Sequence, residues 1–305
     1  MEIKQCEYII TIAEQGSISR AAEKLFLTQS ALNQQLLKLE KELGAPLFIR
    51  LRNRWTTTEV GEVYLQSARE ILRIRDEAYS RIEDLAGQWR RTLTIGVTKE
   101  RGMQMFAGIY NEMHRRYPDM IFQPVEANVS EQNRMLDAGQ IDIGFQTITE
   151  PICSHLEYHT ILFEPFLLCI PRSHPLAYDQ PFSSGDYPTI SLNQFKDDPF
   201  TIVEKLSTMR VAVDRLFKEA GFQPKRLFDC VEMHAMQRLT AGGVCCSILP
   251  RFYATRSEKV CYFRLGDSVG WELMAVHRRD HHLNKAARDF IAVASDFWRA
   301  HPYMD

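Results

Sequence analysis

Residues 16–48 read GSISRAAEKLFLTQSALNQQLLKLEKELGAPLF, and this stretch decides how the N-terminal part of the chain folds. Its pattern predicts two helices joined by a tight turn. Apolar residues continue at helical spacing along the second helix, which Gly44 and Pro46 end. Ser17 and Thr28 precede the two helices, where a hydroxyl can cap free backbone N–H groups. We therefore interpret the stretch as a helix-turn-helix.

The apolar positions indicate how these two helices pack against each other. The first helix carries the small residues Ala21 and Ala22 with Leu25 beside them, and the turn at Phe26-Leu27 follows. Two alanines permit the close approach at a steep angle that a helix-turn-helix requires. The inward stripe of the second helix comprises Ala31, Leu32, Leu36, Leu39 and Leu43.

The outward face of the second helix carries amides, a hydroxyl and one cation: Gln29, Ser30, Asn33, Gln34 and Lys38. Amides pair with adenine, hydroxyls with several bases, and lysine with guanine or phosphate. This face therefore suits the reading of base edges in a DNA major groove. The alternative is the ordinary polar surface of a helix, and the flanking sequence helps to choose between the two.

Both flanks favour the DNA-binding interpretation. Residues 2–14 have apolar side chains at helical spacing, which predicts a further helix that completes a small core. Residues 47–57 predict a β-hairpin wing, with Arg50, Arg52 and Arg54 beside the second helix, where they can reach phosphates or the minor groove. The alternative for Arg50 is a salt bridge to an acid of the same domain.

A long helix is expected from Thr58 to about residue 87, followed by a polar linker at 88–91. Apolar side chains recur there at alternating steps of about three and four residues, which defines a heptad seam and predicts a coiled coil with a second chain. Charged pairs one turn apart, among them Glu77 and Arg81, support the helix beside the seam. The seam comprises Val60, Tyr64, Ser67, Ile71, Ile74, Ala78, Ile82 and Leu85.

From residue 92 onward, short apolar strands alternate with amphipathic helices, which is typical of α/β domains with parallel sheets. The order fits two α/β lobes joined by crossing strands, and ligands of such sheets bind beyond the carboxyl ends of the strands. Strands are expected at 92–97, 121–126, 141–145, 163–171, 200–203, 227–231, 244–249, 262–265 and 271–277. Helices are expected up to residue 116 and at 131–138, 191–195, 208–221, 235–241 and 283–300.

Length and composition are ordinary for a soluble protein of two or three domains. The chain has 305 residues, of which 45% are hydrophobic and 25% charged. No apolar run is long enough to span a bilayer, and the N-terminus lacks the basic-then-apolar layout of a secretion signal. Seven cysteines without a CxxC pair argue against a disulfide framework or a zinc site and favour the reducing cytoplasm.

The net charge of −2 does not by itself indicate a nucleic-acid binder, but its distribution is uneven. Residues 1–57 hold eight Lys and Arg against six Asp and Glu, whereas residues 58–305 hold 29 against 33. A slightly basic N-terminal domain on a slightly acidic remainder fits DNA contact through one end of the chain.

The sequence resembles the LysR-type transcriptional regulators from Met1 through essentially the whole chain. The resemblance is densest in GSISRAAEKLFLTQSALNQQLLKLEKELGAPLFIR and EVGEVYL, and continues through IGV, VEANVSEQNRMLDAGQIDIGF and LTAGGVCCSILP. It implies a winged helix-turn-helix, a dimerising linker helix and a two-lobed effector domain like a periplasmic binding protein. It also implies homodimers that pair into tetramers on double-stranded operator DNA, and a small effector that alters DNA binding.

Two departures from the family pattern fall on the base-reading face. Ser30 stands where the family often has proline, and Asn33 where it often has serine, which suggests a different target sequence rather than lost binding. The expected domains are the winged helix-turn-helix at 1–57, the linker helix and hinge at 58–91, and the effector domain at 92–305, with lobe I at about 92–162 and 267–305 and lobe II at about 163–266. The expected DNA contacts are Ser17, Thr28, Gln29, Ser30, Asn33, Gln34, Lys38, Arg50, Arg52 and Arg54.

The effector cleft is expected where the strand ends of the two lobes face each other. The loop at Thr98 precedes a helix, so its backbone N–H groups and Lys99 could hold an anionic group. The negative charges of Glu100 and Glu204 disfavour an anionic ligand at this place, and favour an amine or a neutral ligand. The alternative at each position is a polar residue that only caps a helix. The expected effector contacts are Thr98, Lys99, Glu100, Asn128, Ser130, Gln146, Thr147, Val203, Glu204, Ser207, Glu232 and Met233.

An α/β enzyme is one alternative function. His155 and His159 lie four residues apart, but in a loop-to-strand region without an HExxH pattern, and neither a phosphate-binding glycine loop nor a GxSxG motif is present. His277, His281 and His282 fit the solvated start of a helix better than a metal site. We therefore expect no enzymatic activity, no cofactor and no metal.

A thiol-based redox regulator is the other alternative. Cys245 and Cys246 are adjacent in a predicted strand, so they point to opposite faces and one of them belongs to the core. Cys153, Cys230 and Cys261 are isolated, and few lysines or arginines stand near any cysteine to lower the pKa of its thiol. The sequence therefore favours regulation by an effector over regulation by oxidation.

Overall fold

The computed structural model describes residues 1–51, 54–86, 92–150, 153–177, 187–205, 207–255, 257–266, 268–279 and 282–302, and only the backbone at 51, 54, 80, 83, 84 and 86. It divides into two compact units, Met1–Trp89 and Arg90–Asp305, which we call the head and the body. Arg52, the linker at 88–91 and His281 lie outside the described residues, as does the side chain of Arg54.

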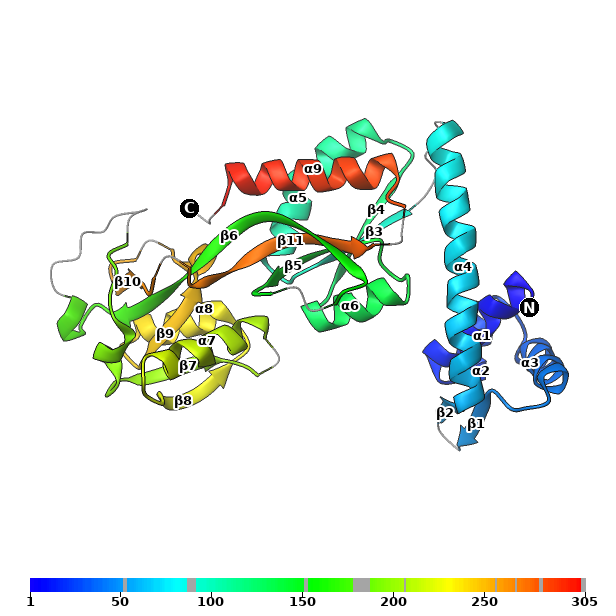
Figure 1. The fold of residues 1–305 in the computed structure, drawn as a ribbon, viewed down its shortest axis with the longest axis horizontal. Helices are drawn as coiled ribbons and strands as arrows, with labels where there is room; N and C mark the ends of the chain where they lie inside the picture. The colour runs from blue at the N-terminus through cyan, green and yellow to red at the C-terminus, as the bar shows by residue number, and fades with distance from the viewer. Residues whose placement is uncertain are drawn as a thin grey trace. The chain divides into compact units, whose positions relative to one another are not determined.

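The head consists of a helical core, a hairpin and one long helix (Figure 1). Its elements are α1 (Ile3–Gln15), α2 (Ile18–Lys24), α3 (Gln29–Leu43), β1 (Phe48–Leu51), β2 (Arg54–Thr57) and α4 (Glu59–Ala86). Ile9 and Ile12 of α1 are buried against Leu32 and Leu36 of α3, and Leu47 closes the same core. The predicted helix-turn-helix and antiparallel wing are both confirmed.

Short polar and glycine contacts set the ends of these helices. Thr28 Oγ1 accepts a hydrogen bond from the Ala31 N–H at 3.2 Å, so this predicted cap is confirmed. Gly44 ends α3 with φ +73°, a left-handed conformation that suits glycine. The cap predicted at Ser17 is wrong in detail: Ser17 occupies the N-cap position of α2, but its hydroxyl makes no capping hydrogen bond there.

Two apolar residues lie elsewhere than the sequence predicts. Leu43 is 44% exposed, because it sits on the last turn of α3, beyond the reach of the core. Tyr64 is only 6% exposed and belongs to the head core rather than to a free seam. The first half of α4 packs in the head core, and Arg75 on α4 lies 2.6 Å from Glu7 on α1.

The body contains one continuous mixed sheet that runs through both lobes (Figure 1). The strands are β3 (Thr92–Val97), β4 (Ile121–Glu126), β5 (Ile143–Ile148), β6 (Leu156–Pro171), β7 (Pro199–Val203), β8 (Lys225–Cys230), β9 (Cys246–Pro250), β10 (Val260–Arg264) and β11 (Gly270–Arg278). Their order is β4-β3-β5-β11-β6-β9-β7-β8, with β10 also paired to β6. β11 is antiparallel to its neighbours β5 and β6, so the sheet is not purely parallel.

β6 is the element that joins the lobes. Residues 156–165 pair with β11 in lobe I, and residues 166–171 pair with β9 and β10 in lobe II. The sequence predicts this strand only from residue 163. The earlier half escapes notice because it is partly exposed and carries Glu157, His159 and Thr160, which do not resemble a buried strand.

Helices cover the sheet in each lobe. In lobe I, α5 (Arg101–Arg116) and α9 (Lys285–Ala300) lie on one face, where Phe290 packs against Phe106 and Phe122, and α6 (Val129–Asp137) lies on the other. In lobe II, α7 (Thr208–Glu219) and α8 (Met233–Ala241) pack on the second core. Three short 3-10 turns complete the described elements, at Pro175–Ala177, Leu192–Phe195 and Arg251–Tyr253. No helix among the described residues is long and apolar enough to cross a membrane.

Candidate functional site

The outward face of α3 presents the polar side chains that the sequence singles out. Gln29, Ser30, Gln34 and Lys38 are exposed, and Asn33 is half-buried. Leu37, which lies outside the expected DNA contacts, is also exposed on α3. These side chains share one face because α3 buries Leu32, Leu36 and Leu39 on the opposite side.

Two hydrogen bonds orient the start of this face. Ser19 on α2 donates from its hydroxyl to Gln29 Oε1 at 3.0 Å, and the hydroxyls of Thr28 and Ser30 lie 3.2 Å apart. With its oxygen held by Ser19, the Gln29 side chain has its amide nitrogen left to donate elsewhere. Ser19 was missed from the sequence, since nothing in its spacing shows that α2 meets the start of α3 there.

Glu40 of α3 links the wing, β1 and β2, to the helices of the head. The Glu40 carboxylate accepts a hydrogen bond from the Leu47 N–H at 2.8 Å and lies 3.8 Å from the guanidinium of Arg50. That guanidinium also lies over the Trp55 ring, 4.8 Å from its centroid. The alternative weighed for Arg50, a salt bridge within its own domain, is therefore present, although the Arg50 side chain remains exposed.

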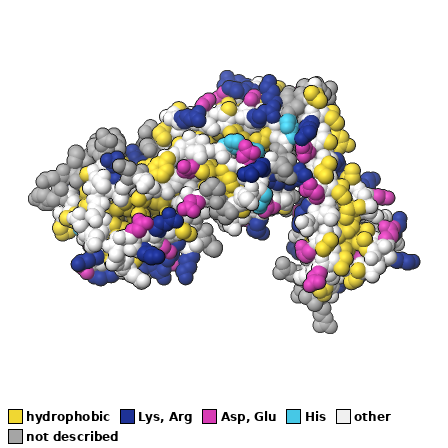
Figure 2. Space-filling view, viewed as in Figure 1, with side chains coloured by type: hydrophobic (Ala, Val, Ile, Leu, Met, Phe, Trp, Pro, Cys, Tyr) yellow, Lys and Arg dark blue, Asp and Glu magenta, His cyan; other side chains and the backbone are white. Residues whose placement is uncertain are grey.

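The second half of α4 carries an unpaired apolar stripe. Ile74 and Ala78 are exposed, Ile82 is 57% exposed and Leu85 is 90% exposed. Figure 2 shows hydrophobic side chains in a band along this helix. This part of the predicted seam is free in the single chain, whereas Tyr64 and the partly buried Ile71 contact the head core.

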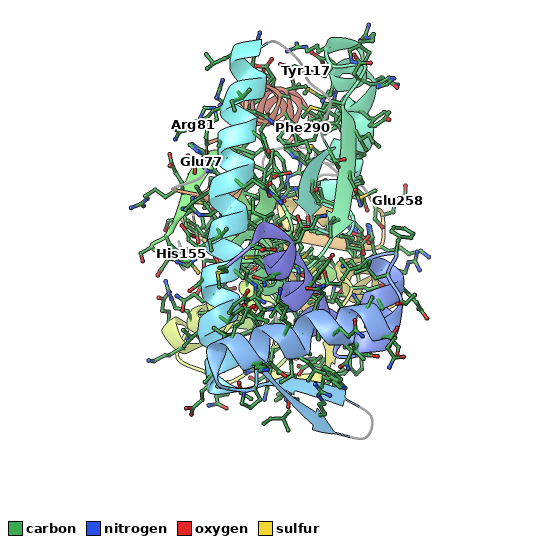
Figure 3. All side chains as sticks on the ribbon, turned by 90° about the vertical axis from the view of Figure 1, so that its right-hand side faces the viewer. Glu77, Arg81, Tyr117, His155, Glu258 and Phe290 are labelled. Carbon is green, nitrogen blue, oxygen red and sulfur yellow. The ribbon has the colours of Figure 1, made fainter. Side chains whose placement is uncertain are left out.

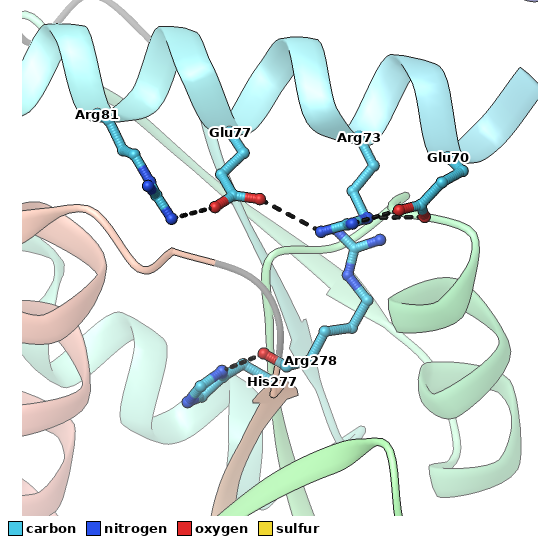
Figure 4. A network of polar contacts seen from close by, with 6 residues as sticks. All are labelled: Glu70, Arg73, Glu77, Arg81, His277 and Arg278. Atoms are coloured by element: carbon cyan, nitrogen blue, oxygen red, sulfur yellow. Dashed lines mark hydrogen bonds and ion pairs between the residues drawn. The ribbon is translucent and has the colours of Figure 1, made fainter.

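A ladder of ion pairs flanks the stripe. Arg73 lies between Glu70 and Glu77, and Arg81 pairs with Glu77 in turn (Figures 3 and 4). Each ladder residue directly precedes a residue of the predicted seam, so the charges border the apolar stripe. Charges in this position of a coiled coil influence which helix pairs with which.

In the body, a group of polar contacts near the strand ends joins lobe I to lobe II. Lys99 Nζ lies 2.9 Å from Glu232 Oε1, and Glu100 Oε2 lies 3.5 Å from His234 Nε2. The Thr208 hydroxyl donates to the Thr147 carbonyl at 2.8 Å. Arg215 and Glu150 approach to 3.4 Å. The strand ends that the sequence predicts to face each other are therefore in contact.

The charge of Lys99 is already balanced within the chain by Glu232. The hydrogen bond and charge of Glu232 raise the pKa of Lys99, and those of Lys99 lower the pKa of Glu232. Burial and the nearby Glu100 carboxylate raise the pKa of Tyr253. The anionic group that Lys99 holds is thus a carboxylate of the other lobe.

Several expected effector residues have structural roles instead of free side chains. Asn128 caps α6, Ser207 caps α7, Gln146 is buried with its amide donating to Asn133, and Val203 is buried. The capping alternative therefore holds for Asn128 and Ser207. Exposed or half-buried side chains remain at Thr98, Ser130, Glu204 and Met233.

A buried ion pair at the crossing strand was missed from the sequence. Arg101 on α5 is bonded to Glu164 on β6, and both side chains are almost fully buried. The Glu164 carboxylate also accepts from the Phe252 N–H and the Trp271 indole N–H. The Arg101 guanidinium stacks on Phe252, 4.5 Å from the ring centroid. Glu164 therefore ties together elements of both lobes.

A separate cavity of about 860 Å³ opens on lobe II, between α7 and β8. The arginines in its lining have ion-pair partners: Arg210 lies 2.8 Å from Asp214, and Arg226 lies 3.4 Å from Asp229. None of the expected effector residues lines it. The lining residues are Ile202, Arg210, Asp214, Phe217, Lys218, Gly221, Phe222, Gln223, Pro224 and Arg226.

The cysteines and histidines bear on the alternative functions. All seven cysteines are free, and burial raises the pKa of the Cys6, Cys169, Cys245 and Cys246 thiols, that of Cys246 to about 12. Raised values disfavour the reactive thiolate. The expectation for His277 was wrong: it lies buried in β11 rather than at the solvated start of a helix.

Comparisons with known proteins agree with this architecture. The family model described as the LysR substrate binding domain matches residues 86–299, and the model described as bacterial regulatory helix-turn-helix protein, lysR family, matches residues 3–62. The regulator AlsR of Bacillus subtilis is 25% identical over 301 residues, covering 97% of this chain and 96% of its own. The Hca operon transcriptional activator HcaR of Escherichia coli is 24% identical over 298 residues, covering 97% and 98%.

Solved structures share the fold over nearly the full length. A full-length OxyR variant from Pseudomonas aeruginosa superposes with a TM-score of 0.72 at 21% identity, covering 98% of this chain and 95% of that one. CbnR in complex with its target DNA superposes with a TM-score of 0.60 at 23% identity, covering 97% and 99%. The chain therefore belongs to the LysR family of DNA-binding transcriptional regulators, with a helix-turn-helix in the head and a substrate-binding effector domain in the body.

Proposed function

We propose that this regulator reads its operator with the α3 face centred on Gln29, Ser30 and Asn33. The observation that carries this is the side-by-side exposure of amide and hydroxyl groups on a helix whose other face is fixed in the core. Gln29, oriented by Ser19, presents an amide suited to adenine, and the exposed Leu37 suits a thymine methyl group.

Phosphate contact comes from the edges of this face. Lys38 on α3 and the wing arginines supply positive charge, with Arg50 held by Glu40 and Trp55 until DNA competes for it. Phosphate contacts position the head but carry no sequence information. Arg50→Ala should therefore weaken binding to all sequences and lower its salt dependence by about one unit of slope.

The test of the reading face is a binding titration of the full chain on operator DNA and on single-base variants. Gln29→Ala should relax the preference at one position, and Gln35→Ala, an exposed glutamine of α3 outside the expected set, is the matched control. Equal loss of sequence preference from Gln29→Ala and Arg50→Ala would contradict the assigned roles.

The apolar stripe on α4 pairs two chains, which gives the regulator its two heads. Ile74, Ala78, Ile82 and Leu85 repeat at coiled-coil spacing and are exposed in the single chain. Two heads on one DNA share the binding free energy, so each needs little basic excess. Dimers then pair into tetramers that contact two operator segments.

Sedimentation of the full chain tests the stripe. Ile82→Glu places a charge in it and should shift the chain toward monomer, whereas Gln66→Glu adds the same charge at an exposed position of α4 outside the expected seam. An unchanged molar mass for Ile82→Glu would place the dimer contact elsewhere.

The effector acts between the lobes, where Lys99 and Glu232 meet. An anionic effector competes with Glu232 for Lys99, and a cationic one competes with Lys99 for Glu232. Either exchange changes the affinity of one lobe for the other, which is how a ligand shifts the equilibrium between two arrangements.

The protein works on DNA in the cytoplasm and has no enzymatic activity. It responds to a metabolite rather than to oxidation of its buried thiols.

Thermal unfolding of the full chain with small carboxylates and with amines tests the cleft. A ligand that raises the melting temperature of the natural chain but not of Lys99→Gln supports the proposed site. Lys218→Gln, at the lobe II cavity, is the matched control. If Lys218→Gln abolished the shift and Lys99→Gln left it unchanged, the effector would bind in the lobe II cavity instead.

A further inference from the structure

Three potential metal ligands meet on neighbouring strands of lobe I, away from the inter-lobe contacts. His277 lies on β11 directly opposite Glu157 on β6, and His159 follows two residues along β6 on the same face. The ligand atoms of the three side chains all lie within 4.8 Å of one another. The crossing strands therefore bring together residues that are 118 positions apart in the chain.

The two imidazole rings face each other through their Nε2 atoms. The Nε2 atoms of His159 and His277 are 2.9 Å apart, and the rings are nearly stacked, with centroids 5.1 Å apart. The Glu157 carboxylate lies 3.6 Å from His159 Nε2. Two ring nitrogens and a carboxylate oxygen thus converge on one small space.

A backbone carbonyl fixes which nitrogen of His277 is available. His277 Nδ1 lies 2.8 Å from the Arg278 carbonyl (Figure 4), and since a carbonyl only accepts, Nδ1 carries the proton. Nε2 of the neutral ring therefore has a free lone pair, which is directed at His159. Histidines that ligate metals are typically held in this way by a second partner on the other nitrogen.

We propose that Glu157, His159 and His277 form a binding site for a divalent transition-metal ion of the zinc class. Two imidazoles and one carboxylate are a donor set that Zn²⁺ accepts, with a water molecule in the fourth position. His277 is only 5% exposed, whereas Glu157 and His159 are partly open to solvent, so an ion has a protected ligand on one side and an entry on the other.

The spacing of the two imidazole nitrogens requires only a small adjustment, and the partly exposed Glu157 side chain turns to bring its carboxylate, now within 4.8 Å of both, onto the ion. Zn²⁺ binds imidazole nitrogens at about 2.0–2.1 Å in tetrahedral geometry, which puts two such nitrogens about 3.3 Å apart. The two Nε2 atoms at 2.9 Å need to separate by a few tenths of an ångström, through rotation of the more exposed His159 ring. The proton that His159 Nε2 donates to His277 moves to Nδ1, so the neutral ring exchanges one tautomer for the other.

Such an ion would clamp β6 to β11, the two strands that continue from lobe I toward lobe II. The sequence predicts no metal site here, because it sets His159 beside His155 rather than beside His277, which is 118 positions away. Metal binding would therefore stabilise the body independently of any ligand at Lys99 and Glu232.

The test measures Zn²⁺ affinity of the full chain by competition with a chromogenic chelator, at neutral pH. The natural chain should bind Zn²⁺ in a site that His159→Gln weakens by more than about 100-fold, the upper end of the loss from removing an outer-shell partner. His155→Gln, an exposed histidine just before β6, is the matched control and should change nothing. Equal affinity in the natural chain and His159→Gln would overturn the proposal.

Two further readouts guard against a variant that simply misfolds. Saturating Zn²⁺ should raise the melting temperature of the body transition by roughly 5–10 °C in the natural chain and in His155→Gln, but not in Glu157→Gln. Co²⁺ in place of Zn²⁺ should give the visible absorption of a tetrahedral centre in the natural chain and in His155→Gln, but not in Glu157→Gln. A Co²⁺ spectrum of octahedral type that persists in Glu157→Gln would show an adventitious surface site and overturn the assignment.

Discussion

The outward face of α3 and the contacts between the lobes place their polar side chains by opposite means. On α3 the side chains come from ten consecutive residues, 29–38, and share a face because the helix repeats every 3.6 residues. Between the lobes, Lys99 meets Glu232, 133 positions away, because separate strands end at the same place. The first arrangement is a property of local sequence, and the second of the whole sheet.

This difference has consequences for how each region responds to substitution. Exposed side chains on a rigid helix contribute one at a time, so single changes on α3 should alter binding without unfolding the head. The lobes are joined by the buried Arg101–Glu164 pair and by the crossing strands, so we expect changes in that pair to affect the whole body.

The largest effect is expected from the buried ion pair. Glu164→Ala leaves the Arg101 guanidinium buried without its partner and the Phe252 N–H without its acceptor, which should lower the free energy of unfolding of the body by about 3–5 kcal/mol. Chemical denaturation followed by the fluorescence of the tryptophans measures this loss.

The double variant Arg101→Leu, Glu164→Leu is the control for that substitution. It removes both charges at once, so it should be far less destabilised than Glu164→Ala, since a buried pair replaced by apolar groups is often close to neutral. If the double variant were as unstable as the single one, the contribution would lie in the hydrogen bonds that Glu164 accepts from Phe252 and Trp271, or in packing there, rather than in charge.

The second effect tests the claim that residues of α3 act singly. Gln29→Ala should cost about 1–3 kcal/mol of discrimination at one base pair while the stability of the head stays unchanged, because Gln29 is exposed. A systematic set of operator variants, measured by fluorescence anisotropy, reports the discrimination. Ser19→Ala should produce part of the same loss, since Ser19 holds the Gln29 oxygen.

A smaller effect is expected in the turn that precedes α3. Phe26 has φ +54° and is 96% exposed, so it adopts a left-handed conformation without any packing in return. Phe26→Asn should stabilise the head by up to about 1 kcal/mol, because asparagine tolerates this conformation better. Thermal unfolding of the head measures it, and a loss of stability would show that the phenyl ring has a contact in the folded state.

The smallest effect concerns the exposed Lys99–Glu232 pair, and the pKa of Glu232 is the quantity that reports it. The pKa of Glu232 lies below its ordinary value of 4.5, because Lys99 stabilises the carboxylate. The contribution of the pair is thus complete above pH 4.5 and disappears as pH falls through the lowered pKa. An NMR titration of Glu232 should show its pKa return toward 4.5 in Lys99→Gln. The pKa should stay low in Lys205→Gln, the control, because this exposed lysine just after β7 is not among the groups that shift the pKa of Glu232.

Much of the head could be predicted from the sequence because its determinants are local. The cap at Thr28, the glycine at the end of α3 and the period of Leu32 and Leu36 each act within a few residues. What failed there was long-range: Tyr64 fits a heptad seam by spacing, yet it is buried because α4 packs in the core with α1 and α3.

In the body, the order of strands and helices could be predicted, but the partners of individual side chains could not. The first half of β6 was missed because its polar residues do not alternate like a buried strand, and it carries Glu157 and His159. The pairing of His159 with His277 depends on the register of β6 against β11, which no local pattern encodes.

By itself the sequence determined the helix-turn-helix, the polar face of α3, the apolar stripe of α4 and the alternation of strands and helices, because backbone periodicity and capping act over a few residues. Only the tertiary structure decided that Lys99 meets Glu232, that Arg101 is neutralised by Glu164, and that two histidines and a glutamate converge. Those contacts depend on which strands become neighbours, and that choice is made by the burial of the whole core rather than by any one segment.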